Sequence, residues 1–420
     1  MFMLHVLGFF AFAADAAETV PGPCDIYEAA GTGCVAAHST VRALYSNYSG
    51  PLYSVWRSTD GATIDIGVRS RGGFANSALQ EQFCGSYDQI AYAKLSTGQV
   101  CESSAQIPTY CGQCGPKWGD FVKCQAMCNA FPSCTHITYF EDEGCRIYSA
   151  CANPTPTSGV MTDIFQRSGT VCSIRAIYDQ SPMGNHIYPA PPGGAAELQD
   201  AGVNAARDPI RVGGNAVFGA YFEGGMGYRR DNTTGIATGD EPQSIYMVVS
   251  GTHYNDQCCF DYGNAETNNN DDGASTMEAV YFGSSTGWGH GSGDGPWVMA
   301  DIENCLSAGS SEGCSDKQPA NTPVVASYVT AVLKGGSGNY TIKGGDASGR
   351  LATMYSGPRP RGYNPMHKQG AIILGIGGDN SDNAVGTFYE GAMTRGYASD
   401  ATDESVQANI ASAGYGKWGS

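Results

Sequence analysis

The chain has 420 residues, and its formal net charge of −17 argues against nucleic acid or anionic membrane surfaces as partners, because like charges repel. Its length allows one large hydrophobic core and a smaller unit, and its 58 glycines follow no repeat, which excludes a fibrous protein. A low charged fraction (15%) and 24 tyrosines favour short strands in a β-sandwich whose surface meets neutral ligands.

Residues 1–16 have the pattern of a secretory signal peptide. An apolar run from Leu4 to Ala14 precedes the small-x-small cleavage site Ala14-Asp15-Ala16, although no Lys or Arg precedes the run. Sixteen cysteines suit an oxidising compartment, and no later apolar run reaches the roughly 18 residues that a membrane span needs. We therefore expect a secreted, extracellular protein without a membrane anchor, in agreement with N-glycosylation acceptors at Asn47, Asn232 and Asn339.

The cysteines are concentrated in one segment. Eight of them, at positions 101, 111, 114, 124, 128, 134, 145 and 151, lie between Cys84 and Cys172. We therefore predict a larger discontinuous domain, residues 17–84 and 172–420, with a cysteine-rich insert at residues 85–171. A unit of that size has a limited core and gains stability from bridges, one of which could join Cys84 to Cys172 at its base.

The insert has the pattern of a small α+β module. Cys124 and Cys128 are spaced for one face of a helix, and Thr135–Phe140 and Cys145–Tyr148 have the composition of strands. The cysteine spacing from position 124 to position 151 resembles that of PAN/apple-type modules.

Two other interpretations of these cysteines compete with structural disulfides. Cys111 and Cys114, separated by Gly-Gln, could form a redox pair, and together with Cys124 and Cys128 they could bind zinc. An oxidising compartment favours structural disulfides instead.

Downstream of residue 240, strand patterns recur at short intervals between turn residues, which is typical of an antiparallel sandwich and not of βαβ units. Helices are predicted at His38–Tyr48 and around Asp403–Ala411, the second with Thr402 as its N-cap. The segment Phe388–Tyr397 is similar to the closing strand of concanavalin-like jelly rolls. The predicted fold class is therefore an all-β, concanavalin-like jelly-roll β-sandwich with a small disulfide-rich α+β insert. The predicted strands are Ser244–Ser250, Met277–Phe282, Trp297–Ile302, Val324–Leu333, Tyr340–Lys343, Ala371–Leu374 and Thr387–Met393.

Two cysteines are adjacent in the sequence, Cys258 and Cys259. A bond between neighbours distorts the peptide that joins them, and strained positions of this kind are often ligand clamps. The alternatives are two separate bridges to distant partners or two free thiols.

The segment Trp297–Asn304 is the first candidate for catalytic residues. On a strand, Trp297, Met299, Asp301 and Glu303 would share one face, because side chains alternate. Two carboxylates, a thioether and an indole on one face suit a cleft, whereas the alternative is an edge strand with solvated acids.

A second candidate carboxylate, Asp379, follows the predicted strand Ala371–Leu374 in the run Gly375–Asn380. Three glycines before the acid allow the backbone to approach a ligand closely. The run lacks the GxGxxG pattern and the lysine of a phosphate-binding loop, so the alternative is a glycine-rich turn with a solvated carboxylate.

Paired carboxylates across a cleft are what glycoside hydrolysis requires, one as the acid and the other as the nucleophile or the base. Trp288, flanked by glycines, suits a platform for the apolar face of a sugar. The sequence has neither GxSxG nor HExxH, and no metal or other cofactor is expected. The polar stretch Asn268–Asp272 could hold calcium, but a solvated loop is the favoured interpretation.

A series of motifs resembles, in order, the catalytic domain of glycoside hydrolase family 54, a family of secreted α-L-arabinofuranosidases. The resemblance covers residues 22–84 and 172–416 and implies a jelly-roll-like sandwich and a retaining double displacement. The motifs are Gly22–Tyr27, Ala36–Thr40, Arg42–Tyr45, Tyr178–Ser181, Ala190–Gly194, Gly251–Tyr254, Cys258–Glu266, Met277–Gly283 and Gly375–Ser381.

The resemblance also implies roles for individual residues. Glu303 matches the nucleophile of the family and Asp379 its general acid/base. Cys258 and Cys259 match a disulfide that forms a wall of the sugar pocket. Cys24–Cys34 matches one further disulfide, and Cys84 and Cys172 match the cysteines of another. Residues matching those around the bound arabinofuranose are Met277, Trp288, Asp301, Asn304 and the backbone of Gly378.

Two features depart from the family pattern. The cysteine-rich insert is not part of it, and Cys305 stands where the family commonly has glycine, with Cys314 nearby as a candidate partner. We expect a monomeric exo-α-L-arabinofuranosidase that releases terminal arabinofuranose from the side chains of an arabinose-containing polysaccharide, either hemicellulose or pectin. The alternatives are a lectin-like carbohydrate-binding protein on the same sandwich, or the same enzyme fold acting on a β-xyloside or a galactofuranoside.

Overall fold

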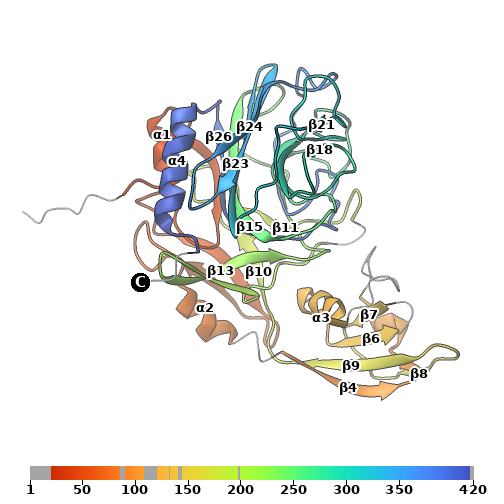
Figure 1. Ribbon diagram of the computed structural model, residues 1–420. Coiled ribbons are helices and arrows are strands. Elements are labelled where there is room, and N and C mark those ends of the chain that lie inside the picture. The colour runs from red at the N-terminus through yellow and green to blue at the C-terminus, as the bar shows by residue number, and fades with distance from the viewer. Residues whose placement is uncertain are drawn as a thin grey trace, which may run out of the picture.

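The computed structural model describes residues 20–85, 90–107, 121–131, 133–140, 144–196 and 199–416, so the predicted signal peptide lies outside the described residues. Two antiparallel sheets form the main body (Figure 1). The larger sheet has the order β12 (Asp208–Val212), β13 (Asn215–Phe222), β26 (Gly386–Arg395), β15 (Gln243–Tyr254), β22 (Tyr328–Gly336), β23 (Asn339–Asp346) and β24 (Ala352–Pro358), and β1 (Cys34–Ser39) also pairs with β26. The second sheet has the order β11 (Tyr188–Pro189), β14 (Tyr228–Arg230), β25 (Ala371–Leu374), β16 (Asp261–Ala265), β17 (Glu278–Gly283), β19 (Trp297–Asp301) and β20 (Leu306–Ser307).

The hydrophobic core lies between these two sheets. Strands β17 and β19 contact β15 and β22 across the sandwich. Val280 of β17, and Val298 and Ala300 of β19, belong to one buried cluster with Met247 of β15 and Ala331 of β22. Burying these faces against each other is what makes the sandwich stable. The predicted all-β sandwich is confirmed, and each strand predicted after residue 240 is present, with β22 beginning at Tyr328 instead of Val324.

Smaller elements flank the sandwich. The strands β10 (Cys172–Ile177), β2 (Pro51–Arg57) and β3 (Thr63–Gly67) form a three-stranded sheet, and β18 (His290–Gly291) runs parallel to β21 (Lys317–Gln318). Helix α2 (Ser77–Cys84) precedes the insert, and α1 (Pro23–Ala29) lies beside α4 (Asp400–Ala413) on the outside of the sandwich (Figure 1).

The helix predicted at His38–Tyr48 is wrong. Residues 34–39 form strand β1, all six of them buried, and His38 binds the hydroxyl of Tyr262 and the carbonyl oxygen of Asn185, each at 2.9 Å. Pairing with β26 and burial in the core decide the conformation here, and both depend on residues far away in the sequence.

The C-terminal helix is present as α4, but its cap differs from the prediction. The hydroxyl of Ser399, not of Thr402, accepts the hydrogen bond from the backbone N–H of Thr402. Helix α4 is tied to the larger sheet by Asp403, whose carboxylate lies 2.7 Å from the ammonium groups of both Lys334 and Lys343.

The insert forms a separate lobe below the sandwich in Figure 1. Helix α3 (Phe121–Ala130) packs on a sheet of β4 (Ala91–Thr97), β9 (Thr162–Ser168), β6 (His136–Phe140) and β7 (Gly144–Tyr148), while β5 (Gln99–Val100) pairs with β8 (Thr155–Pro156) and Ser103–Ala105 is a 3₁₀ turn. Disulfides Cys124–Cys145 and Cys128–Cys134 hold the helix in place, and Cys101–Cys151 closes the lobe.

These bonds decide one of the alternatives for the insert. Cys124 and Cys128 are both oxidised, so they are not available to bind zinc. Cys111 and Cys114, the possible redox pair, lie outside the described residues.

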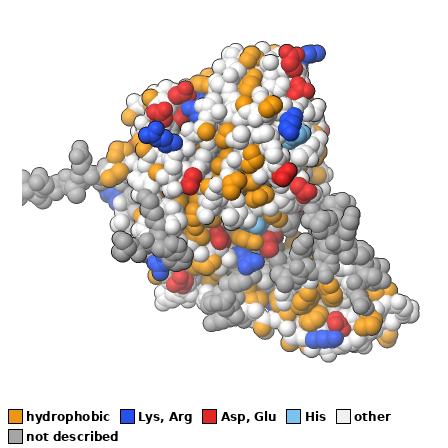
Figure 2. All heavy atoms as spheres, viewed as in Figure 1, with side chains coloured by type: hydrophobic (Ala, Val, Ile, Leu, Met, Phe, Trp, Pro, Cys, Tyr) orange, Lys and Arg blue, Asp and Glu red, His pale blue; other side chains and the backbone are white. Residues whose placement is uncertain are grey.

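Four disulfides lie in or at the base of the sandwich. Cys84 and Cys172 are joined where the chain leaves and re-enters the sandwich, with their Cα atoms 5.8 Å apart. The others are Cys24–Cys34, Cys258–Cys259 and Cys305–Cys314. None of the described helices is long and apolar enough to cross a membrane. On the face shown in Figure 2, acidic and basic side chains of the described residues are interspersed and do not separate by sign.

Candidate active site

Glu303 lies in a turn directly after β19, and not on the strand as predicted. The strand ends at Asp301, and Glu303 and Asn304 both adopt left-handed backbone conformations, with φ of 63° and 58°. The alternation of side chains between the two faces of the strand therefore ends at Asp301. Non-glycine residues rarely adopt these conformations, and they persist where the surrounding structure enforces them, often at functional sites. One such contact is the hydrogen bond of 3.2 Å from the Glu303 N–H to Oδ1 of Asp301.

Strand β19 separates the core from the site. Val298, Ala300 and Ile302 belong to the main core, whereas Trp297 and Met299 belong to a second buried cluster that includes Cys259. The indole of Trp297 and the thioether of Met299 therefore pack in the same cluster as Cys259, on the side of the strand that faces the site.

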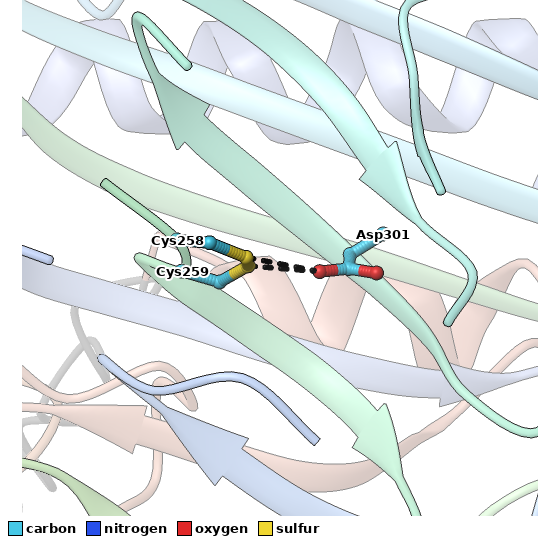
Figure 3. Close-up of side chains that lie close together, drawn as sticks. All are labelled: Cys258, Cys259 and Asp301. Atoms are coloured by element: carbon cyan, nitrogen blue, oxygen red, sulfur yellow. Dashed lines mark hydrogen bonds between the residues drawn. A yellow bond between two sulfur atoms is a disulfide. The ribbon is translucent and has the colours of Figure 1, made fainter. Parts of the chain in front are cut away.

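The disulfide between Cys258 and Cys259 faces Asp301 (Figure 3). Oδ2 of Asp301 lies 3.1 Å from Sγ of Cys259 and 4.0 Å from Sγ of Cys258. Burial raises the pKa of Asp301 to about 7, and the neighbouring carboxylates Glu266 and Asp379 act in the same direction. Complete burial raises the pKa of Asp261 well above its usual range, and the neighbouring carboxylate of Asp301 acts in the same direction.

The loop that carries Asp379 follows β25 and comes very close to Glu303. A Cβ added at Gly378 would lie 2.9 Å from Oε2 of Glu303 and 2.9 Å from Sδ of Met277, which is closer than real Cβ atoms come to such neighbours. Only glycine fits there. Asp379 itself is half-buried, and its Oδ1 accepts a hydrogen bond of 2.9 Å from the N–H of Ser381. The loop that carries Asp379, 76 positions further along the sequence, therefore lies next to Glu303.

Arg229 of β14 holds this loop, and the sequence analysis did not find it. Its buried guanidinium donates to the carbonyl oxygen of Gly378 at 2.6 Å, to Oδ1 of Asn380 at 3.0 Å and to the carbonyl oxygen of Glu266. Asn380, with φ of 63°, donates in turn to the carbonyl oxygen of Pro191 at 2.9 Å. A buried arginine has no local sequence signal that distinguishes it from a solvated one.

Glu266 is a second residue that was missed, although it ends the motif Cys258–Glu266. It is fully buried, and its Oε1 accepts a hydrogen bond of 2.5 Å from the hydroxyl of Thr276. Burial raises the pKa of Glu266, and burial together with Asp301 and Glu266 raises the pKa of Glu303 to about 11. The acid that closes a recognised motif could have been examined as a site residue.

The remaining predicted site residues differ in exposure. Trp288 is 45% exposed, as a platform for a ligand requires, whereas Met277 is buried beside Gly378. Asn304 is exposed and donates a hydrogen bond of 2.9 Å to Oδ1 of Asp271. The bond Cys305–Cys314 closes the next loop of the chain.

The polar stretch that was considered for calcium makes hydrogen bonds with neighbouring side chains. Asn268 donates to both carboxylate oxygens of Asp272, which also accepts from Gln369 at 2.6 Å. These contacts describe a hydrogen-bonded surface loop, the favoured interpretation of the sequence.

Comparison with known proteins identifies the family of the chain. A family model described as "Alpha-L-arabinofuranosidase B, catalytic" matches residues 23–99 and 149–416 and leaves out only residues 100–148 of the insert between them. A probable α-L-arabinofuranosidase B of Aspergillus fumigatus is 44% identical over 403 residues, which are 94% of this chain and 63% of that protein. An α-L-arabinofuranosidase of Hypocrea jecorina is 44% identical over 401 residues, with coverage of 94% and 63%.

Two solved structures also superimpose on the chain. A glutamate-to-glutamine mutant of a GH54 α-L-arabinofuranosidase, soaked with 4-nitrophenyl α-L-arabinofuranoside, is 41% identical and has a TM-score of 0.72, with coverage of 94% of this chain and 66% of that one. An arabinofuranosidase complexed with arabinofuranosyl-α-1,2-xylobiose is 40% identical, also with a TM-score of 0.72 and with coverage of 95% and 67%. The chain spans less than two thirds of the length of the curated relatives cited above. The chain belongs to the α-L-arabinofuranosidase B catalytic-domain family, glycoside hydrolase family 54.

Proposed function

We propose that this protein is a retaining exo-α-L-arabinofuranosidase with Glu303 as nucleophile and Asp379 as general acid/base. The observation that supports this most is the close approach of Gly378, next to Asp379, to the carboxyl group of Glu303. This contact supports the proposal because a double displacement requires an acid and a nucleophile on either side of the same glycosidic bond. The choice of arabinofuranose as the sugar rests on the names of the relatives, which are α-L-arabinofuranosidases.

The reaction has two steps. Glu303 attacks the anomeric carbon and forms an ester as the glycosidic bond breaks, while Asp379 gives its proton to the departing oxygen. Asp379 then takes a proton from water, which attacks the same carbon and frees Glu303. The two displacements together retain the configuration of the sugar.

The surrounding residues would bind the furanose ring. Asp301 is buried and oriented by the N–H of Glu303, so its carboxylate suits the hydroxyl groups of a sugar. Asn304 and the backbone of Gly378 would add polar contacts. The Cys258–Cys259 disulfide, Met277 and the exposed face of Trp288 suit the apolar side of the ring.

The natural substrate in this proposal is an arabinose-containing side chain of hemicellulose or pectin. The relative complexed with arabinofuranosyl-α-1,2-xylobiose favours arabinoxylan among these polymers. The protein would act outside the cell as a monomer, in agreement with the signal-like residues 1–16 and with exposed sequon asparagines at Asn47, Asn232 and Asn339. Residues 85–171 would form a PAN/apple-like module, a division supported by the Cys84–Cys172 bond at its base.

The test measures hydrolysis of 4-nitrophenyl α-L-arabinofuranoside, with the matching β-xyloside and galactofuranoside as competing substrates. We expect Glu303→Gln to lower turnover about 10⁴-fold or more without loss of the fold. The control is Glu312→Gln, an exposed residue paired with Arg361, which we expect to retain full activity.

The Asp379→Ala variant separates the two roles. Added azide should restore its turnover of this substrate, because azide attacks the ester without a general base and 4-nitrophenolate leaves without a proton. Near-normal arabinose release by Glu303→Gln would refute the assignment. Sugar binding without hydrolysis by the wild-type protein would favour the lectin-like alternative.

A further inference from the structure

Glu266 places a second carboxyl group directly beside Glu303. It follows β16, its side chain is fully buried, and its backbone carbonyl oxygen is held by Arg229. Its Oε1 accepts the hydrogen bond from Thr276, which fixes the rotation of the carboxyl group.

The other oxygen of Glu266 faces the candidate nucleophile. Oε2 of Glu266 is buried and has no hydrogen-bond partner among the described residues. The carboxyl groups of Glu266 and Glu303 interact with each other. A Cβ added at Gly378 would lie 2.9 Å from Oε2 of Glu303 and closer still to Oε2 of Glu266, so both oxygens crowd one point. Two carboxyl groups this close cannot both ionise at low cost, and they therefore retain one proton between them.

We propose that Glu266 is a positioning residue for Glu303: it accepts the proton of the pair on Oε2 and, as the neutral acid, donates a hydrogen bond that holds the Glu303 carboxylate ready to attack. This inference rests on the proposed function. The O–H bond on Glu303 breaks as the O–H bond on Glu266 forms, so the pair keeps one proton and one negative charge throughout.

The direction of this transfer follows from the charges around the pair. In the free enzyme, burial and the acids Asp301, Glu266 and Asp271 favour the protonated form of Glu303. The transition state places positive charge on the sugar ring next to Glu303. That charge stabilises the Glu303 carboxylate. Glu266, whose pKa is raised by burial, is the neighbouring acceptor for the proton.

Other titratable groups face the pair. They are Asp301 from β19, Asp271 from the loop after β16, and Tyr363, whose pKa is raised by burial and by Asp301, Glu303 and Asp271. Asp379, from the loop after β25, acts on Asp301. None of these groups is substituted in the variants described below, so they contribute to the pH profile of every variant in the same way.

The test compares the pH dependence of kcat/KM for Glu266→Gln and Glu266→Met. A glutamine is neutral, keeps an oxygen for Thr276 and donates from its amide as the protonated acid does. We therefore expect Glu266→Gln to retain most of kcat. The acidic limb of its kcat/KM profile should lie within about half a pH unit of that of the wild type, because in both proteins this limb reports the ionisation of Glu303 beside a neutral neighbour.

Methionine keeps the length of the side chain but cannot donate. We expect Glu266→Met to lose about 10- to 100-fold in kcat/KM, as for one hydrogen bond to a charged group. Its acidic limb should move to higher pH, because the Glu303 carboxylate loses a hydrogen bond that stabilises it. Asp272→Asn removes an exposed charge from the nearby loop and should leave the limb in place.

Two other outcomes would overturn the inference. A limb that moves to lower pH in Glu266→Gln would mean that Glu266 acts as an anion. Unchanged limbs in both Glu266 variants, with only a lower Tm, would mean that it acts through the fold alone.

Carboxyl ¹³C shifts of glutamate-labelled protein give a readout that does not depend on turnover. We expect the signal of a protonated carboxyl group at pH 7 in the wild type that is absent in Glu266→Gln. Burial also raises the pKa of Glu223 to about 7, and its signal should be the same in both proteins. An inactive wild type that shows the Glu266-dependent signal would refute the proposed function, whereas an active wild type without it would refute the shared proton.

Discussion

The guanidinium of Arg229 donates a hydrogen bond of 2.6 Å to the carbonyl oxygen of Gly378, the residue before Asp379. The same side chain binds the carbonyl oxygen of Glu266. One buried arginine therefore fixes the loop of the candidate acid relative to the segment that contacts the candidate nucleophile. Neither carbonyl oxygen lies in a strand, so neither has a hydrogen-bond partner from a neighbouring strand, and the arginine provides that partner instead.

Replacing this arginine should impair catalysis more than binding. The guanidinium also binds Asp231, and in Arg229→Lys the single ammonium group cannot reach all four acceptors. Each buried carbonyl left unpaired costs about 1–3 kcal/mol. We expect kcat for 4-nitrophenyl α-L-arabinofuranoside to fall at least about 10-fold, because the loop of Asp379 loses its fixed position. Arg361→Lys, at an exposed ion pair, serves as the control. Wild-type kcat in Arg229→Lys would show that the loop keeps its position without the clamp.

A methyl group at Gly378 should block the site. In Gly378→Ala the new Cβ would meet Oε2 of Glu303 and Sδ of Met277, each at 2.9 Å, and would come closer still to Oε2 of Glu266. The side chains around Glu303 must therefore move. We expect kcat/KM to fall about 100-fold or more, since displacing a reacting group by 1 Å has effects of this size. Gly349→Ala, where the nearest atom would be 3.5 Å away, should change neither activity nor Tm. The idea fails if Gly378→Ala turns over normally.

The disulfide Cys258–Cys259 should affect substrate binding more than stability. The bond joins neighbouring residues and closes no loop, so it constrains the unfolded chain very little and should add little stability. Its sulfur atoms, however, lie 3.1 and 4.0 Å from Oδ2 of Asp301. We expect the double variant Cys258→Ala, Cys259→Ala to raise KM about 10-fold with a small change in Tm. The double variant Cys24→Ala, Cys34→Ala should do the reverse, with unchanged KM and a loss of about 2–3 kcal/mol in unfolding free energy. A similar KM in both would contradict a role for the adjacent pair in the sugar pocket.

The ion pairs that hold α4 provide a stability test away from the site. Asp403 is buried between Lys334 and Lys343, so Asp403→Ala leaves two buried ammonium groups short of a partner and should cost about 3–5 kcal/mol in denaturant unfolding. Asp400 contacts the same lysines, but its side chain is 76% exposed, so Asp400→Ala should cost less than about 1 kcal/mol. Equal losses would mean that burial does not decide the strength of these pairs.

The pH dependence of this cluster has a definite sign. Hydrogen bonds with Lys334 and Lys343 lower the pKa of Asp400 to about 2, below its ordinary value of about 3.9. Its contribution is therefore present above about pH 4 and is lost as the pH falls through 2. Urea unfolding at pH 5 and pH 2.5 should show a smaller difference between wild type and Asp400→Ala at the lower pH.

Excising the insert should leave the sandwich folded. Cys84 and Cys172 are bonded with their Cα atoms 5.8 Å apart, so a short linker can replace residues 86–170. Phe131 is the main residue of the insert that packs against the core of the sandwich, and its loss should lower Tm by a few degrees. We expect the shortened protein to hydrolyse 4-nitrophenyl α-L-arabinofuranoside at a rate similar to that of the full chain. Inactive but folded protein would mean that the insert contributes to the site.

Much of the sandwich could be predicted because its strands carry local signals. The strands after residue 240 alternate or run apolar between turn residues, and the glycines before Asp379 announce a close backbone approach that the structure contains at Gly378. The position of Glu303 was harder to predict. Alternation places it on the face of β19, but two left-handed residues end the strand before it, and only Asn304 is of a type that favours such a turn.

The errors and omissions have a common physical origin. No helix forms at His38–Tyr48, where His38 and Ser39 instead pair with β26, more than 340 positions away in the sequence. Arg229 and Glu266 become site residues through contacts with Gly378 and Glu303, which are distant in sequence. Long-range contacts of this kind leave no periodicity or spacing that a single sequence displays.

The bond between Cys84 and Cys172 has a consequence for how such a protein can change over time. Any folded unit whose two ends lie about as close together as these cysteines could be carried at the same point without altering the strand order of either sheet. One accessory module can therefore replace another at this position while the geometry of the sandwich stays constant.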